Sequence, residues 1–169
     1  MLKSVLKWQM EKARAVTEGM IAALSTPAEW THQVHPKANH PLWVVGHLAL
    51  ADNFFLQAAA PTRGQMPDGW NGIFWFGTTP VADPSQYPAP DVVVAYFRER
   101  RETLLNVLEF MTDAELQAPM PAGFPFSKSP CIAQLFSHAA FHEGLHSGQF
   151  SVAHRDLGHS PLFQPPPAE

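Results

Sequence analysis

Four stripes of apolar residues, each spaced for one face of a helix, constrain the fold of this chain most strongly. In the first stripe, apolar residues recur at steps of three or four positions. They are Leu2, Leu6, Met10, Ala13, Val16, Met20 and Leu24. Similar stripes lie within residues 43–58, 93–111 and 135–157. Because no segment shows a convincing strand pattern, the sequence predicts an all-α fold, a four-helix bundle.

Prolines and turn residues mark the ends of the first three helices. The first helix is expected to end before Pro27, and the second to run from near Asn39 to just before Pro61. The third begins at Pro90 and ends at Thr112. Its charged face includes Arg98, Glu99 and Arg101.

The fourth helix has a start and a stop signal. Ser129 and Pro130 suit the N-cap and the first helical position, and Gly158 suits the C-terminal end. We therefore expect one helical domain over residues 1–158 and an extended tail over residues 159–169.

Two long connections interrupt the helical pattern. Residues 61–90 contain glycines, prolines and the aromatic residues Trp70, Phe74, Trp75 and Phe76, and are expected to lack regular structure. Residues 118–128 are a second loop of this kind, with Phe124 and Phe126. Such loops either cover a functional site or close the ends of the bundle with packed aromatics.

Composition excludes several classes of partner. The net charge is -4 and no run of basic residues is present, so nucleic acid is not expected as a partner. The first residues do not have the pattern of a secretory signal, and no apolar run approaches the ~20 residues that span a bilayer. Since Cys131 is the single cysteine, an intramolecular disulfide is excluded and we expect a cytoplasmic protein.

Histidines within the apolar stripes indicate a metal site. His142 and His146 are one helical turn apart, about 6 Å along the axis, and His47 lies on the second stripe. A core imidazole without a partner costs roughly 1–3 kcal/mol. One divalent ion shared by three histidines would remove these costs and leave a position open for water or substrate.

Spacing alone leaves the ligand set open. His138 continues the series on the fourth helix, but it lies about 12 Å along the axis from His146, too far for one ion to bind all three. The ligating pair is either His138 with His142 or His142 with His146. His40 shares a helix face with His47, and we expect His40 and His138 to line a pocket or support the ligands.

Other residues near this series have expected roles or positions. Glu143 is about 100° from His142 around the helix, which favours a contact between helices over a role as a base. Gln149 is placed either to reach the pocket and hydrogen-bond water or substrate, or to support a ligand. The remaining histidines are expected in solvent; they are His32, His35, His154 and His159.

Three stretches of the sequence resemble the DinB-like superfamily, which includes bacillithiol and mycothiol transferases. They are HPLWVVGHLALADNFF at 40–55, FGTTPVADPSQYPAPDVVVAYFRERRETLLNVLEFMTDAEL at 76–116, and FSHAAFHEGLHSGQFSVAHRDLG at 136–158. The resemblance implies that the histidine of GHL and the two of HExxHxGQ bind the metal; here these are His47, His142 and His146. It also implies an up-down-down-up bundle and a homodimer.

The resemblance implies a metal-dependent enzyme, an S-transferase that joins a low-molecular-weight thiol to an electrophile. Because a metal would activate a bound water in the same way, a hydrolase is the second form of this hypothesis. The alternatives are a non-catalytic metal or small-ligand binding bundle of stress-response type, and a structural protein with vestigial histidines. Three histidines and water favour zinc or nickel and also suit iron or manganese.

Overall fold

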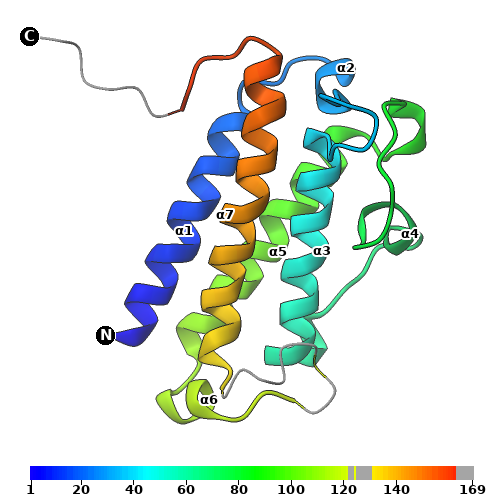
Figure 1. The fold of residues 1–169 in the computed structure, drawn as a ribbon. Coiled ribbons are helices and arrows are strands. Elements are labelled where there is room, and N and C mark those ends of the chain that lie inside the picture. Colours follow the sequence, from blue (N-terminus) through cyan, green and yellow to red (C-terminus); the bar gives the residue numbers. More distant parts are fainter. Residues whose placement is uncertain (122–123, 125–130, 163–169) are drawn as a thin grey trace, which may run out of the picture.

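Four long helices lie side by side in the computed structural model, which describes residues 1–121, 124 and 131–162 (Figure 1). They are α1 (Leu2–Ile21), α3 (Pro41–Ala59), α5 (Pro90–Phe110) and α7 (Ala133–Asp156). The described residues form no strand, and the predicted all-α fold is confirmed. No helix in these ranges is both long enough and apolar enough to cross a bilayer.

The long helices form two parallel pairs, α1 with α7 and α3 with α5, and the two pairs run in opposite directions. Following the colours of Figure 1, α1 and α7 ascend while α3 and α5 descend. The first turn of α1 therefore lies beside the end of α5, where Lys3 donates a hydrogen bond to the carbonyl of Glu109 (3.2 Å). Because α3 and α7 run in opposite directions, residues late in α7 lie beside residues early in α3.

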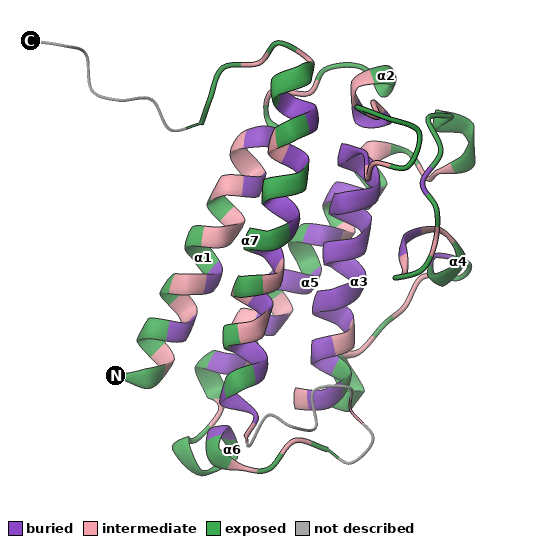
Figure 2. Ribbon diagram, viewed as in Figure 1, coloured by how far each residue is buried: buried purple, intermediate pink, exposed green. Residues whose placement is uncertain are grey.

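Helix α3 is at the centre of the core and is buried on nearly all sides (Figure 2). One apolar cluster gathers around Trp43, Phe97 and Phe150, and a second around Phe55 and Phe136. A side chain on α3 is therefore held by neighbours in every direction, which suits a helix that has to position a site.

Where the predicted helix ends lie within the described residues, they agree with the structure to within about two residues, except at the first helix. Helix α1 stops at Ile21, well before Pro27. Thr26 begins a separate short helix, α2 (Pro27–Trp30), through a capping box with Glu29. Thr112 likewise caps a short helix, α6 (Asp113–Gln117), that directly follows α5.

The connection between α3 and α5 does contain regular structure, so the expectation of an irregular loop is wrong. Its short elements are η1 (Pro61–Arg63), α4 (Asn71–Phe74) and η2 (Pro84–Gln86). Trp70 and Phe74 are buried in the core, whereas Trp75 is half-buried and Phe76 is exposed. Trp70 and Phe74 therefore close the bundle, whereas Trp75 and Phe76 lie farther from the core.

Part of the second loop and the start signal of the fourth helix lie outside the described residues. This applies to Ser129, Pro130 and Phe126. The described part of α7 begins at Ala133, with Ile132 in the capping position.

Candidate metal centre

Three histidines from two helices converge on one point. His47 lies in the middle of α3, and His142 and His146 lie on successive turns of α7. The Nε2 atom of His142 is 3.3 Å from Nε2 of His47 and 3.1 Å from Nε2 of His146. One potential ligand atom from each residue lies within 4.8 Å of the others. The structure thus brings together the three histidines that the family motifs indicate.

Hydrogen bonds on the far side of two rings direct their lone pairs toward this point. Nδ1–H of His47 donates to the carbonyl of Phe74 (2.9 Å), because a carbonyl can only accept. Nδ1–H of His146 donates to Oε1 of Gln149 (3.0 Å). In a neutral imidazole with Nδ1 protonated, Nε2 carries the lone pair. Both lone pairs therefore face the same small space, as in histidines that bind a metal.

The spacing of the nitrogens fits one divalent ion. Metal–nitrogen bonds of about 2.0–2.1 Å in a tetrahedral arrangement place neighbouring nitrogens about 3.3 Å apart. An octahedral arrangement with the same bonds gives about 3.0 Å. The two close separations, 3.1 and 3.3 Å, lie in this range. The triad could therefore hold an ion with little rearrangement and leave further positions free.

Burial keeps these histidines neutral. Desolvation, assisted by the nearby His146, lowers the pKa of His47 to about 4. Desolvation, with contributions from the neighbouring histidines, lowers the pKa of His142 to about 3. Burial also lowers the pKa of His146. All three rings are deprotonated near pH 7, the form that binds a metal.

Gly46 and Phe74 together fix the orientation of His47. A Cβ atom at Gly46 would lie 2.4 Å from the ring of Phe74, so the glycine allows that ring to pack against α3. The backbone of Phe74 then lies where its carbonyl reaches His47. The GHL motif contains this glycine, but the sequence held no sign of its partner, because Phe74 lies in a segment without helical periodicity.

Gln149 is held beside His146 by a residue from another segment. Its Oε1 atom accepts hydrogen bonds from Nδ1–H of His146 and from the side-chain amide of Asn39 (2.9 Å). The structure thus places Gln149 behind a ligand, in the supporting one of its two expected positions, and not facing water or substrate. Asn39, just before α3, was not identified from the sequence.

Glu143 is completely buried in an ion network on a different face of α7. Its Oε1 atom accepts from Nε–H of Arg14 (2.9 Å) and from the hydroxyl of Thr17 (2.8 Å). Its Oε2 atom lies 2.8 Å from Nη1 of Arg101. Arg101 also forms a two-pronged ion pair with Asp52 (2.8 and 2.9 Å). Glu143 therefore joins α7 to α1 and α5, as expected for a contact between helices.

His138 and His40 lie in different surroundings. The ring of His138 stacks on His142 with centroids 6.0 Å apart, but His138 is not part of the converging group. His40 caps α3, where its Nδ1 atom accepts from the backbone N–H of Trp43 (3.1 Å). Its ring packs edge-on against Tyr87. Of these two, only His138 borders the space beside the triad.

His154 was expected in solvent, but it is only 3% exposed. The chain turns back after α7 at Gly158, where φ is +88°, and N–H of His159 donates to the carbonyl of His154 (3.2 Å). The centroids of the His154 and His159 rings lie 4.7 Å apart. The turn at Gly158 therefore covers a position that periodicity alone placed on the outside.

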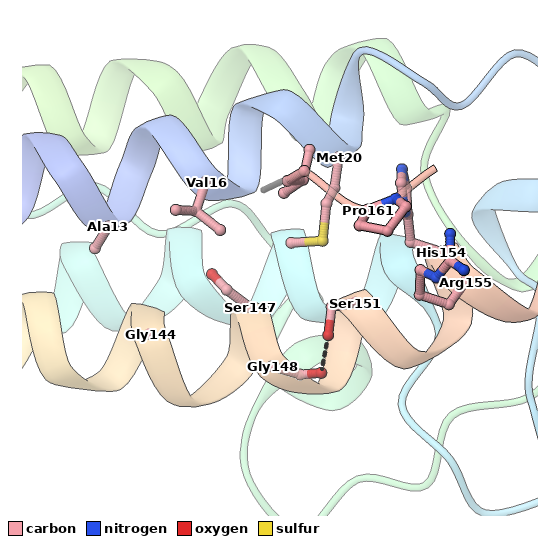
Figure 3. A pocket seen from close by; sticks show the side chains of 11 residues that line it. Ala13, Val16, Met20, Gly144, Ser147, Gly148, Ser151, His154, Arg155 and Pro161 are labelled. Atoms are coloured by element: carbon pink, nitrogen blue, oxygen red, sulfur yellow. Dashed lines mark hydrogen bonds between the residues drawn. The ribbon is translucent and has the colours of Figure 1, made fainter. Parts of the chain in front are cut away.

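Two of the cavities formed by the described residues adjoin α7, each at different residues of that helix. The cavity at the triad has a volume of about 200 Å³ and includes His47 and His142 in its lining. A larger one of about 480 Å³ lies between α1 and α7 (Figure 3). Its lining includes Val16, Met20, Ser147, Gly148 and Ser151. Because two of the three converging histidines border the first cavity and none borders the second, we place the functional site at the first.

Comparisons with known proteins agree with this fold. The sequence model of the DinB superfamily matches residues 9–150, which include the whole triad. A similar solved structure is described as the conserved protein of locus from Enterococcus faecalis, with 16% sequence identity and a TM-score of 0.68. The similarity covers 90% of this chain and 94% of that one. No curated protein matches the chain.

Proposed function

The chain belongs to the DinB superfamily, and from this premise we propose that it is a metal-dependent enzyme that joins a low-molecular-weight thiol to an electrophile. His47, His142 and His146 would hold one divalent ion, with zinc or nickel favoured. The convergence of three buried imidazoles, two of them with hydrogen-bonded Nδ1 atoms, carries this proposal.

The arrangement suits activation of a thiol. When bound, a divalent ion supplies Lewis acidity, which lowers the pKa of a thiol or water beside it. The three histidines come from two packed helices, so they leave the side toward the cavity free for substrates. In the transfer, the thiol releases its proton to water and a sulfur–carbon bond forms. The bond between that carbon and its leaving group breaks, and the electron pair leaves with the group.

The surroundings of the triad support thiol transfer over hydrolysis. No carboxylate borders the triad cavity among the described residues. Glu143, next to a ligand in the sequence, is held by Arg14 and Arg101 on another face of α7. Metal-assisted hydrolysis commonly uses a nearby carboxylate as a base, whereas a thiol of lowered pKa is already a nucleophile.

Metal analysis tests the first half of the proposal. We expect one equivalent of a divalent ion in the isolated protein, or in protein stripped with a chelator and reloaded. His142→Ala should abolish binding, while the matched variant His138→Ala should retain it. An absence of stoichiometric metal under both conditions would rule the proposal out.

A conjugation assay tests the second half. Metal-loaded protein is incubated with a panel of cellular thiols and methyl iodide, an electrophile small enough to make no demand on the cavity. Loss of free thiol and release of iodide are measured. We expect a rate above that of His142→Ala with at least one thiol. Equal rates for both proteins with every thiol would contradict the transferase activity, even if the wild-type protein binds metal.

A further inference from the structure

The cavity at the triad has an aromatic lining. His47 and His142 form the part of its wall that belongs to the triad. The other lining residues are Ala51, Phe54, Phe55, Trp75, Phe76 and His138. Helices α3 and α7 thus provide two sides, and the segment that follows α4 provides the third.

Neighbouring rings around this space meet edge to face or at a tilt. Trp75 meets Phe54 in a T-shaped contact with centroids 5.5 Å apart, and it lies 6.5 Å from His47. The rings of Phe55 and His142 also form a T-shaped contact, with centroids 6.4 Å apart. Phe76 packs on Trp75 and is 72% exposed, so the aromatic surface continues to the outside. An aromatic guest would find both ring faces and ring edges in contact range.

Size and charge narrow the class of guest. The volume of about 200 Å³ is somewhat larger than the engineered apolar cavity of about 150 Å³ that binds benzene in another protein. It therefore holds a phenyl ring with one small substituent. Among the described residues no Lys, Arg, Asp or Glu lines it, so a charged group away from the triad would lose its water without gaining an ion-pair partner.

We infer that this cavity binds a neutral, phenyl-sized group of the electrophilic substrate and holds it beside the histidine triad. The inference rests on the proposed function for the role of the guest. The aromatic wall of Phe54, Phe55 and Trp75 selects that group, and the triad end of the cavity receives its reactive carbon. The thiol approaches from the positions that the three histidines leave free.

Binding of three planar probes of similar size tests the inference. Protein stripped of metal with a chelator is titrated with benzyl alcohol, benzenesulfonate and N-methylpyridinium, because a bound divalent ion would itself attract the sulfonate. Binding is followed by calorimetry and ligand-observed NMR. We expect benzyl alcohol to bind about tenfold or more tightly than either ion. Equal or tighter binding of either ion would overturn the inference.

Variants locate the bound probe. Ala51→Leu adds volume inside the triad cavity and should weaken benzyl alcohol binding about tenfold or more. Ser151→Leu, the matched control, adds the same side chain to the cavity between α1 and α7 and should leave binding unchanged (Figure 3). Trp75→Ala, which removes one wall, should also weaken binding. Binding that is unaffected by Ala51→Leu and Trp75→Ala, or lost in Ser151→Leu, would overturn the inference.

Metal content separates this inference from the proposed function. It is measured in each variant, and we expect it to stay at one equivalent because none of the three changes removes a triad histidine. If wild-type protein holds no metal, the proposed function fails while the probe titration still decides what the cavity binds. If metal is retained but benzyl alcohol does not bind, the cavity assignment alone is wrong.

Discussion

Replacing Glu143 by glutamine should lower the stability of the fold without removing the metal site. The network that contains Glu143 has two cations, Arg14 and Arg101, and two anions, Asp52 and Glu143, so its formal charge is balanced. Glu143→Gln leaves one uncompensated positive charge in the core. The glutamine oxygen can still accept from Arg14 and Thr17, but its NH2 group would then face Nη1–H of Arg101.

The size of the effect follows from the burial of these groups. Glu143 is fully buried and Arg101 is nearly so. Breaking a buried ion pair by removing one partner costs about 3–5 kcal/mol. The ion pair of Arg101 with Asp52 remains, which keeps the expected loss near the middle of that range, about 4 kcal/mol. With a urea m value of about 2 kcal/mol/M, the unfolding midpoint should fall by about 2 M.

Urea unfolding followed by helical circular dichroism measures this loss, and metal analysis runs beside it. Glu102→Gln is the matched control, because Glu102 is exposed next to Arg101; its midpoint should move by less than about 0.3 M. We expect Glu143→Gln to bind one equivalent of metal at temperatures where it stays folded. A variant of unchanged stability that has lost metal-dependent turnover would refute the structural role and make Glu143 a catalytic group.

Three further substitutions test residues that stabilise the helices and ligands of the metal site. His40→Asn keeps an acceptor at the N-cap of α3 but removes an imidazole ring. Burial lowers the pKa of this ring to about 4, from about 6.5 in the unfolded chain. The native state therefore binds fewer protons than the unfolded state between these values, and stability is lost as the pH falls from 6.5 to 4. Wild type should lose about 3 kcal/mol more than His40→Asn over this range in urea titrations, and parallel curves would contradict the assignment. Gln149→Leu removes the acceptor for His146 and should weaken metal binding about 10- to 100-fold in chelator competition, whereas the exposed Gln134→Leu should not. Gly46→Ala places a Cβ atom 2.4 Å from the Phe74 ring and should cost about 1–3 kcal/mol, while Gly144→Ala, with open space at its Cβ, should cost nothing.

Helix positions were predictable where proline and periodicity agreed. Pro90 begins α5 as expected, and α3 begins at Pro41, two residues after the expected start near Asn39. Proline suits the first turn of a helix, and an apolar stripe follows each of these prolines. The stripe pattern could not show that α3 is buried on all sides, since that depends on how many neighbours surround it. The short helix α4 was missed because a single turn leaves no periodic signal.

The triad was only partly predictable from the sequence. Residue spacing allowed His138 with His142 as readily as His142 with His146, and the family motifs favoured the second pair. In the structure, His146 lies opposite His47 because α3 and α7 run in opposite directions, whereas His138, two turns earlier, lies beside Phe55. The position of the crossing between the two helices decides the pair, and no local pattern contains that information.

Helix α5 shows that charged residues close together in the sequence can differ in burial. Arg98, Glu99 and Arg101 form one charged face in the sequence, but Arg101 is buried and Arg98 is exposed. Arg101 enters the core because Asp52 and Glu143 meet it from α3 and α7. The same network binds the faces of α3 and α7 that lie away from the triad. These ion pairs therefore help to hold together the two helices that carry His47 and His142, so the network supports the metal site through the stability of the fold and not through contact with a ligand.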